Sequence, residues 1–349
     1  MTRRPAPLVY FERWLDPVAE EILAKRPEIE LMRLSYGDPV ADTDTRMRRA
    51  YGYQISPRTE LLGPWFGDGE LLTKCSNLLV ISSSGAGYDM VDVDACTVAG
   101  VIVCSQTGTN AAAVAEHALG MMLALAKKIA VSDKVMRRGG DLDRFGFKAT
   151  DLERKTVGIV GIGNIGSRTA TLCKAFGMRV IAYDPCLSAD AIAAKGAVKV
   201  ELDDLLAQSD FVSVHCPRSE ATLGMFALAQ FRKMKPSAHF INTARGGIHV
   251  EDDLADALKE GTILGAGVDV FLSEPAKPDH RLLAFENVVA SPHIAGMTDG
   301  ALYNMAAAAA DQWITIINGG VPPRLVNPEA WPKYAERFQR LLGFAPARL

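Results

Sequence analysis

The sequence predicts an α/β protein built on two doubly wound parallel sheets. Short apolar runs alternate with helical patterns almost from end to end, which is typical of strands joined by crossover helices. The length of 349 residues suggests two domains at the usual size of about 100–200 residues each. A composition of 48% hydrophobic and 23% charged residues is that of a globular chain with a sizeable core.

Composition and charge argue against several other classes of protein. The 38 Lys and Arg against 41 Asp and Glu leave a net charge of −3, so the chain as a whole shows no electrostatic footprint for nucleic acid or anionic membrane, which leaves only a local basic patch open. The basic N-terminus precedes no signal-peptide pattern, and the apolar stretch 111–126 is interrupted by Glu116 and His117. Six cysteines without CxxC spacing predict reduced thiols in a cytoplasmic protein, and no metal-ligand spacing appears.

Two series of elements follow one another along the chain. The first contains predicted strands at residues 8–11, 29–34, 78–82 and 101–105, with helical segments such as 17–25 and 69–74 between them. The second is more regular, with predicted strands at residues 156–160, 179–183, 211–214, 239–242, 265–268 and 288–290. Six strands with crossover helices complete a dinucleotide-binding sheet.

Long helices at residues 111–128 and 299–318 flank the second series. We therefore expect residues 107–298 to form one domain, and residues 1–106 together with 299–349 to form a second, discontinuous domain. A cleft between two lobes is the usual place for a ligand.

A glycine-rich loop is the sharpest local signal. A β-branched strand runs directly into Gly161-Ile162-Gly163-Asn164-Ile165-Gly166, which opens a helix. In such a loop Gly161 permits the tight turn, Gly163 lets the backbone approach a pyrophosphate, and Gly166 lets helix and strand pack closely. The amide groups at the helix start favour the phosphate charge. The next strand ends at Asp184, where a carboxylate binds ribose hydroxyls and repels a 2′-phosphate, so the pattern favours NAD over NADP.

Three polar residues follow later strands of the same sheet, at the edge where ligands bind. They are Arg245, Glu274 and His293. Hydride transfer from an alcohol requires a base for the hydroxyl proton, and histidine performs this near neutral pH. A carboxylate on the far imidazole nitrogen fixes the tautomer and stabilises the imidazolium, while an arginine binds a substrate carboxylate with its planar fork.

Six ordered motifs make the sequence resemble the D-isomer-specific 2-hydroxyacid dehydrogenase family over roughly residues 78–328. They are Gly85-Ala86-Gly87-Tyr88-Asp89, the segment from Asn110 through Val114-Ala115-Glu116-His117, the glycine loop, Asn242-Thr243-Ala244-Arg245-Gly246, Gly265-Ala266-Gly267-Val268-Asp269-Val270-Phe271 and Ser291-Pro292-His293-Ile294-Ala295-Gly296.

The resemblance implies a Rossmann cofactor domain inserted into a flavodoxin-like substrate domain, with NAD as cofactor and a homodimer joined mainly through the cofactor domain. It implies His293 as acid/base, Glu274 as its partner and Arg245 as the substrate-orienting residue, with the N–H groups of Ala86 and Gly87 on the substrate carboxylate. The implied cofactor contacts are Asn164 and Ile165 in the glycine loop and, beyond it, Asp184, Cys216, Pro217, Thr243, Ala244, Asp269 and Gly296. The implied reaction interconverts a small D-2-hydroxy acid and its 2-keto acid.

Some positions differ from the family pattern, and for others the sequence leaves two roles possible. His249-Val250-Glu251 stands where similar proteins usually read Val-Asp-Glu, and we expect a changed helix cap there. Two roles are compatible with Arg58: it contacts a distal anionic group of the substrate, or it is a solvated loop residue. For Trp65 and Phe66 core packing is favoured over closure on a substrate.

Two other functions are compatible with the same sequence features. A non-enzymatic NAD(H) sensor of the corepressor type keeps the same fold and the same three residues. A phosphoglycerate-specific dehydrogenase within the family is the other, because nothing in the sequence identifies the 2-hydroxy acid. Formate dehydrogenase relatives carry glutamine where this chain has Glu274, which argues against that activity.

Overall fold

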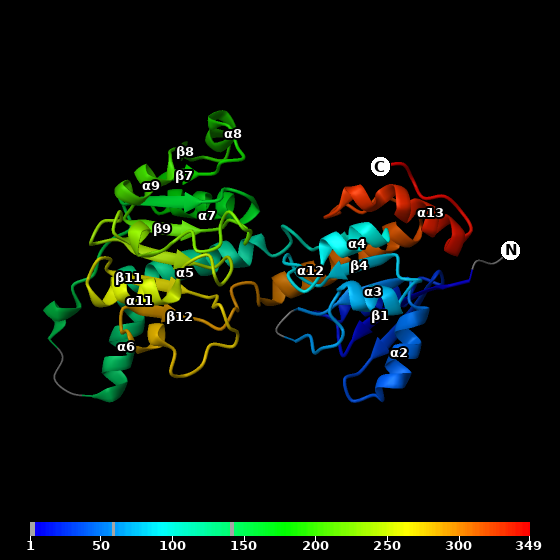
Figure 1. Ribbon diagram of the computed structural model, residues 1–349. Coiled ribbons are helices and arrows are strands. Elements are labelled where there is room, and N and C mark those ends of the chain that lie inside the picture. The colour runs from blue at the N-terminus through cyan, green and yellow to red at the C-terminus, as the bar shows by residue number, and fades with distance from the viewer. Residues whose placement is uncertain (1–3, 58–59, 140–142) are drawn as a thin grey trace. The chain divides into compact units, whose positions relative to one another are not determined.

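The computed structural model describes residues 4–57, 60–139 and 143–349 of the chain. The chain divides into two compact units. Unit 1 contains Met1–Asn110 and Asp299–Leu349, and unit 2 contains Ala111–Thr298. Each unit has its own parallel sheet, as the ribbon in Figure 1 shows.

The sheet of unit 1 has five parallel strands in the order β2-β1-β3-β4-β5. This is the 2-1-3-4-5 order of flavodoxin-like folds, which confirms the predicted fold class for this unit. The strands are β1 (Ala6–Phe11), β2 (Ile29–Leu34), β3 (Gly52–Ile55), β4 (Val80–Ser83) and β5 (Ile102–Cys104). The helices are α1 (Val18–Leu23), α2 (Val40–Arg49), α3 (Gly69–Lys74), α4 (Val93–Ala99), α12 (Asp299–Ile317) and α13 (Trp331–Leu342), with a 3₁₀ turn η3 (Pro328–Ala330).

The core of unit 1 combines residues from both ends of the chain. Trp313 of α12 is fully buried with Leu8 of β1, and its indole N–H donates to the side-chain oxygen of Gln54 in β3. Tyr334 and Phe338 of α13 lie in the same cluster. Trp65 is buried in the cluster on the other side of the sheet, with Phe66 packed against it, in agreement with core packing.

The sheet of unit 2 has seven parallel strands in the order β12-β11-β10-β9-β6-β7-β8. Counted from β6, the first six strands follow the 3-2-1-4-5-6 order of the Rossmann fold, which confirms the predicted fold class. The strands are β6 (Thr156–Val160), β7 (Arg179–Tyr183), β8 (Val198–Lys199), β9 (Phe211–Val214), β10 (His239–Asn242), β11 (Gly265–Val268) and β12 (Val288–Ala290). The helices are α5 (Ala111–Ala126), α6 (Ile129–Arg138), α7 (Asn164–Ala175), α8 (Ala189–Ala194), α9 (Leu202–Gln208), α10 (Leu228–Phe231) and α11 (Glu251–Lys259), with 3₁₀ turns η1 (Arg144–Phe147) and η2 (Arg281–Ala284).

The prediction of six strands for this sheet was wrong by one. The additional strand, β8, pairs only through Ile181–Val198 and Ala182–Lys199 at the edge of the sheet. A segment of two residues, one of them Lys199, carries no alternating apolar pattern from which a strand is recognised.

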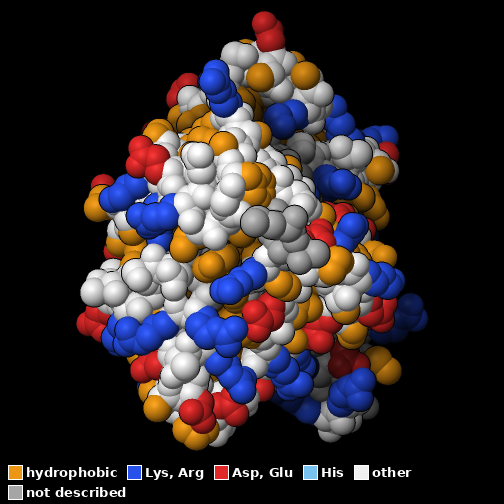
Figure 2. Space-filling model, turned by 90° about the vertical axis from the view of Figure 1, so that its right-hand side faces the viewer, with side chains coloured by type: hydrophobic (Ala, Val, Ile, Leu, Met, Phe, Trp, Pro, Cys, Tyr) orange, Lys and Arg blue, Asp and Glu red, His pale blue; other side chains and the backbone are white. Residues whose placement is uncertain are grey.

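The surface carries charges of both signs. Figure 2 shows Lys and Arg side chains lying among Asp and Glu side chains on the face that it presents. Within the described part of the chain, no helix is both long and apolar enough to span a bilayer. The six cysteines are free, and Cys75, Cys96, Cys104 and Cys173 are buried.

Candidate active site

The glycine loop joins β6 to α7 in unit 2. Gly161 has φ +85°, and a Cβ on Gly166 would lie 2.2 Å from the carbonyl oxygen of Gly161, so the first turn of α7 packs directly on the loop. A Cβ on Gly163, by contrast, would meet no atom within 4 Å. Gly163 is the N-cap of α7 and no side chain caps the helix. The loop therefore presents helix-start amides and an open approach, as a pyrophosphate requires.

Other predicted cofactor residues lie at the same edge of the sheet. Asp184 follows β7, and its carboxylate accepts the N–H of Ile162 at 3.1 Å and of Cys186 at 3.0 Å. Cys216 and Pro217 follow β9, and a Cβ on Gly161 would lie 2.7 Å from the backbone nitrogen of Cys216.

The hydroxyl of Thr243, after β10, is buried and has no hydrogen-bond partner among the described residues. A buried hydroxyl costs free energy unless it is paired. This orphaned group, together with the open glycine loop, fits a bound dinucleotide. Ala244 is the next residue after Thr243, and Gly296 lies in the segment that follows β12.

His293 and Glu274 are in direct contact. Nδ1 of His293 lies 2.8 Å from Oε2 of Glu274, and Oε1 of the same carboxylate accepts the backbone N–H of Phe271 at 3.0 Å. The two residues come from the segments after β12 and β11, adjacent strands of the sheet. The structure therefore brings these two candidate residues together.

The pKa of Glu274 lies below its ordinary value of 4.5. Burial raises this pKa, but the hydrogen bond and charge of His293, the N–H of Phe271 and the charge of Arg245 together lower it by more. The carboxylate is consequently ionised at neutral pH and can only accept hydrogen bonds. Nδ1 of His293 must therefore carry the proton between them, which leaves Nε2 to exchange a proton with a ligand.

Asp269 holds the segment that carries His293. Its backbone oxygen accepts the N–H of His293 at 2.7 Å. Its fully buried carboxylate accepts the N–H of Ile294 at 2.9 Å, the N–H of Ala295 at 3.0 Å and the hydroxyl of Ser291 at 2.6 Å. His293 has φ 56°, a left-handed conformation that is unusual outside glycine. These bonds offset the cost of that conformation.

His117 of α5 also contacts the residues that hold the segment of His293. Its Nε2 lies 2.9 Å from the hydroxyl of Ser291 and 3.8 Å from Asp269. The predicted cofactor contact Asp269 thus has a second, structural task that the sequence did not reveal.

Arg245 follows β10 in the loop that contains Thr243. Its Nη1 donates to the carbonyl oxygen of Ala244 at 2.7 Å, and its charge acts on Glu274. The side chain of Asn242 fixes this loop from inside, since Oδ1 accepts the N–H of Ala244 at 2.9 Å and Nδ2 donates to the carbonyl of Arg245 at 3.0 Å. Arg245, Glu274 and His293 are therefore grouped in one unit.

The remaining predicted residues are placed elsewhere. Ala86 and Gly87 belong to unit 1, in the turn after β4, where the hydroxyl of Ser83 donates to the carbonyl of Gly87. Arg58 lies outside the described residues. No group of three or more His, Cys, Asp or Glu among the residues that the structure describes could hold a metal ion.

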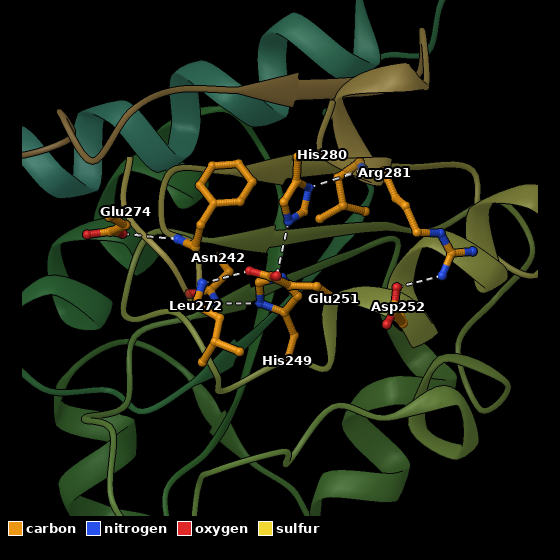
Figure 3. A network of polar contacts seen from close by, with 10 residues as sticks. Asn242, His249, Glu251, Asp252, Leu272, Glu274, His280 and Arg281 are labelled. Atoms are coloured by element: carbon orange, nitrogen blue, oxygen red, sulfur yellow. Dashed lines mark hydrogen bonds and ion pairs between the residues drawn. The ribbon is translucent and has the colours of Figure 1, made fainter. Parts of the chain in front are cut away.

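A polar network that the sequence did not indicate lies beside this site. Glu251, at the start of α11, accepts the N–H of Leu272 and contacts His280 (Figure 3). Val250, the N-cap of α11, gives no side-chain cap, in agreement with the changed helix start expected from the sequence. His249 is buried, and its Nδ1 lies 2.9 Å from Nδ2 of Asn242.

Comparison with known proteins identifies the family. Residues 119–295 match the family model described as D-isomer specific 2-hydroxyacid dehydrogenase, NAD binding domain. The chain belongs to this family. A glyoxylate reductase of Aeropyrum pernix is 34% identical over 93% of this chain and 96% of its own length. The matched region is the NAD-binding domain of a family of oxidoreductases that act on 2-hydroxy acids, and it includes the glycine loop, Arg245, Glu274 and His293.

Two further relatives show how much of the chain the similarity covers. A D-3-phosphoglycerate dehydrogenase of Archaeoglobus fulgidus is 39% identical over 80% of this chain, which spans 53% of the length of that relative. The solved D-lactate dehydrogenase of Aquifex aeolicus, in complex with NAD and lactic acid, is 28% identical with a TM-score of 0.77. That similarity covers 91% of this chain and 98% of the other.

Proposed function

We propose that this protein is an NAD-dependent oxidoreductase that interconverts a small D-2-hydroxy acid and its 2-keto acid. The contact of 2.8 Å between His293 and the ionised Glu274 carries this proposal, because it produces a proton donor and acceptor at the ligand-binding edge of an NAD-type sheet. NAD, when bound, supplies or accepts the hydride. Unit 2 is then the cofactor domain and unit 1 the substrate domain.

The side chains divide the remaining work among them. In the direction of oxidation, Nε2 of neutral His293 accepts the hydroxyl proton, and the carboxylate of Glu274 stabilises the imidazolium that forms. In the direction of reduction, the imidazolium gives this proton to the carbonyl oxygen. Arg245 binds and orients the substrate carboxylate through its planar fork. Ala86 and Gly87 contribute backbone N–H groups to that carboxylate, as the family resemblance implies.

A panel of substrates tests the activity. Glyoxylate, hydroxypyruvate, pyruvate and 3-phosphohydroxypyruvate are each offered with NADH and with NADPH, and the loss of reduced cofactor absorbance is followed. We expect steady turnover with at least one keto acid and a preference for NADH, because the carboxylate of Asp184 repels a 2′-phosphate. Cofactor binding without turnover on any keto acid would instead favour the sensor that the sequence left open; the names of the relatives support an enzyme.

The proposal includes a homodimer formed through unit 2. None of the residues of α6 is buried, and Ile129, Met136 and the nearby Phe145 are 55%, 69% and 89% exposed. Figure 1 shows α6 extending from unit 2. Apolar side chains presented in this way are typical of a surface that a second copy covers. Cytoplasmic location is proposed on the free, mostly buried thiols.

Sedimentation tests the dimer. The wild type is expected at twice the chain mass of 37.6 kDa, and M136D and F145D are expected to shift toward one chain mass because a charge is costly in an apolar interface. The matched control is V98D in unit 1, where Val98 is 75% exposed. A wild type of single-chain mass would refute the proposed assembly.

A further inference from the structure

The turn that carries Glu274 is fixed from outside by two residues that take no part in the proposed chemistry. It follows β11 and runs through Phe271 and Leu272 to Glu274. One carboxylate oxygen of Glu274 bonds within the turn and the other bonds to His293. The position of the carboxylate therefore depends on the position of the turn.

Glu251 holds the backbone of this turn. Its Oε1 accepts the N–H of Leu272 at 2.7 Å, and its side chain is only 19% exposed. Glu251 is the first residue of α11, so the acceptor is attached to a regular helix. A charged acceptor makes a hydrogen bond roughly twice as strong as a neutral one.

His280 in turn holds Glu251. Its Nε2 lies 3.0 Å from Oε2 of Glu251, while its Nδ1 accepts the N–H of Leu282 at 3.3 Å. Because Nδ1 is the acceptor, Nε2 carries the proton and donates to the carboxylate. The imidazole ring of His280 also packs edge-on against the ring of Phe271, with 5.1 Å between the ring centroids. In Figure 3 the carboxylate of Glu251 lies between the ring of His280 and the backbone of Leu272.

The same turn contacts the loop of Arg245. A Cβ on Gly246 would lie 1.9 Å from the carbonyl oxygen of Phe271, so the two backbones touch. A shift of the turn therefore disturbs both the partner of His293 and the loop that orients the substrate.

We infer that Glu251 and His280 are positioning residues that keep Glu274 in register with His293. The inference rests on the proposed dehydrogenase activity. Loss of the Glu251 carboxylate releases the N–H of Leu272 and lets the turn move. A displacement of about 1 Å at a catalytic group is enough to reduce turnover by up to about 100-fold.

A double-mutant cycle on kcat tests the inference with the full chain and the best keto acid. E251A is expected to lower kcat about tenfold while the KM for NADH stays within about twofold. In the E274Q background the same substitution is expected to change kcat by less than about threefold, because the turn then no longer delivers a carboxylate and only its effect on the loop of Arg245 remains. Equal effects in both backgrounds would overturn the inference and point to a general structural role.

Conservative and neighbouring variants complete the kinetic test. E251Q retains an oxygen for the N–H of Leu272 and is expected to recover most of kcat. H280Q retains a hydrogen-bond donor toward Glu251, so its kcat is expected to be higher than that of H280A. R281A is the matched control, since the exposed Arg281 pairs with Asp252 and Asp256 and does not touch the turn. A kcat for R281A as low as that for E251A would count against the inference.

A second measurement does not depend on turnover. In protein with ¹⁵N-labelled histidine and no cofactor, the ring signals of His293 are expected to move in E251A toward their positions in E274Q, and to stay in place in R281A. If the wild type turns over no keto acid, the proposed function fails and this spectrum alone decides the inference. Unmoved His293 signals in E251A would overturn it.

Discussion

The two nitrogens of the His293 ring have different roles: Nδ1 bonds to Glu274, and Nε2 exchanges the proton with the ligand. The backbone around His293 helps to fix this orientation of the ring. Nδ1 faces an ionised carboxylate, so the neutral ring is protonated there and reacts at Nε2. The left-handed conformation at His293 is maintained by three bonds to Asp269, one from its own N–H and two from the residues that follow. The ring is thus oriented by its main chain as well as by Glu274.

Removal of the ring tests its task at this scale. H293A is expected to lower kcat by at least about 10²-fold, because general acid–base catalysis supplies a factor of that size. The measurement is steady-state NADH oxidation with the best keto acid, with NADH binding followed separately by fluorescence to show that the site is intact. A near-normal kcat in H293A would refute the assignment of the acid/base.

Elements far apart in the sequence are joined in unit 1 by single polar residues. Asn327, between α12 and α13, is buried, and its Oδ1 accepts the N–H of Val103 in β5 at 2.7 Å. Its Nδ2 donates to the carbonyl of Val101 at 3.1 Å and to the hydroxyl of Thr97 in α4 at 2.9 Å. The C-terminal segment therefore continues the hydrogen bonding of a strand more than 200 positions earlier.

Loss of this amide is expected to destabilise unit 1. N327A leaves the buried N–H of Val103 without its partner and is expected to lower the free energy of unfolding by about 1–3 kcal/mol. N318A is the matched control, because Asn318 bonds to Glu28 and Ile314 at an exposed position and is expected to cost less than about 0.5 kcal/mol. Urea unfolding measures both, and equal losses would contradict the expectation.

The sequence predicted the elements best where strands are apolar and bounded by glycine or polar residues, as in β6, β9, β10 and β11. It did not reveal β3, whose segment Gly52-Tyr53-Gln54-Ile55 includes a glycine and a glutamine. The glutamine is buried because Trp313 bonds to it from α12, a partner that no local pattern indicates.

The site shows the same division. Arg245, Glu274 and His293 were predicted because strand ends of one sheet meet at one edge. Glu251 and His280 were not, because their importance depends on a hydrogen bond to a backbone N–H, which leaves no trace in residue type. Glu251 reads only as one of three acidic residues in the first turn of a helix.

For the molecule as a whole, two buried histidines and the half-buried His215 limit the tolerance of acid. Burial lowers the pKa of His215 to about 3, and the pKa values of His239 and His249 to about 4, from the ordinary 6.5. At a pH between the folded and unfolded pKa values, these histidines are protonated in the unfolded chain but neutral in the folded chain. The free energy of unfolding therefore falls as the pH falls from 6.5 toward 4, and the loss is complete once the folded histidines are themselves protonated.

Replacement of one of these histidines measures how much it contributes to the loss of stability in acid. Each is expected to contribute about 2 kcal/mol to the loss of stability between pH 7 and pH 5, since one pKa shift unit corresponds to about 1.4 kcal/mol. H249L removes one titrating ring, so its loss over this range is expected to be smaller than that of the wild type by about this amount. Urea unfolding at the two pH values gives the comparison, and identical losses would exclude His249 as a contributor.

The order in which the ribosome delivers the chain follows from the composition of the unit 1 core. Strands β1 to β5 are made before unit 2, but Trp313, Tyr334 and Phe338, which complete their apolar cluster, are made only after it. The nascent N-terminal strands must wait, incompletely covered, while the inserted Rossmann sheet folds. Chaperone engagement during translation is therefore expected to concentrate on residues 1–110, although they leave the exit tunnel before unit 2.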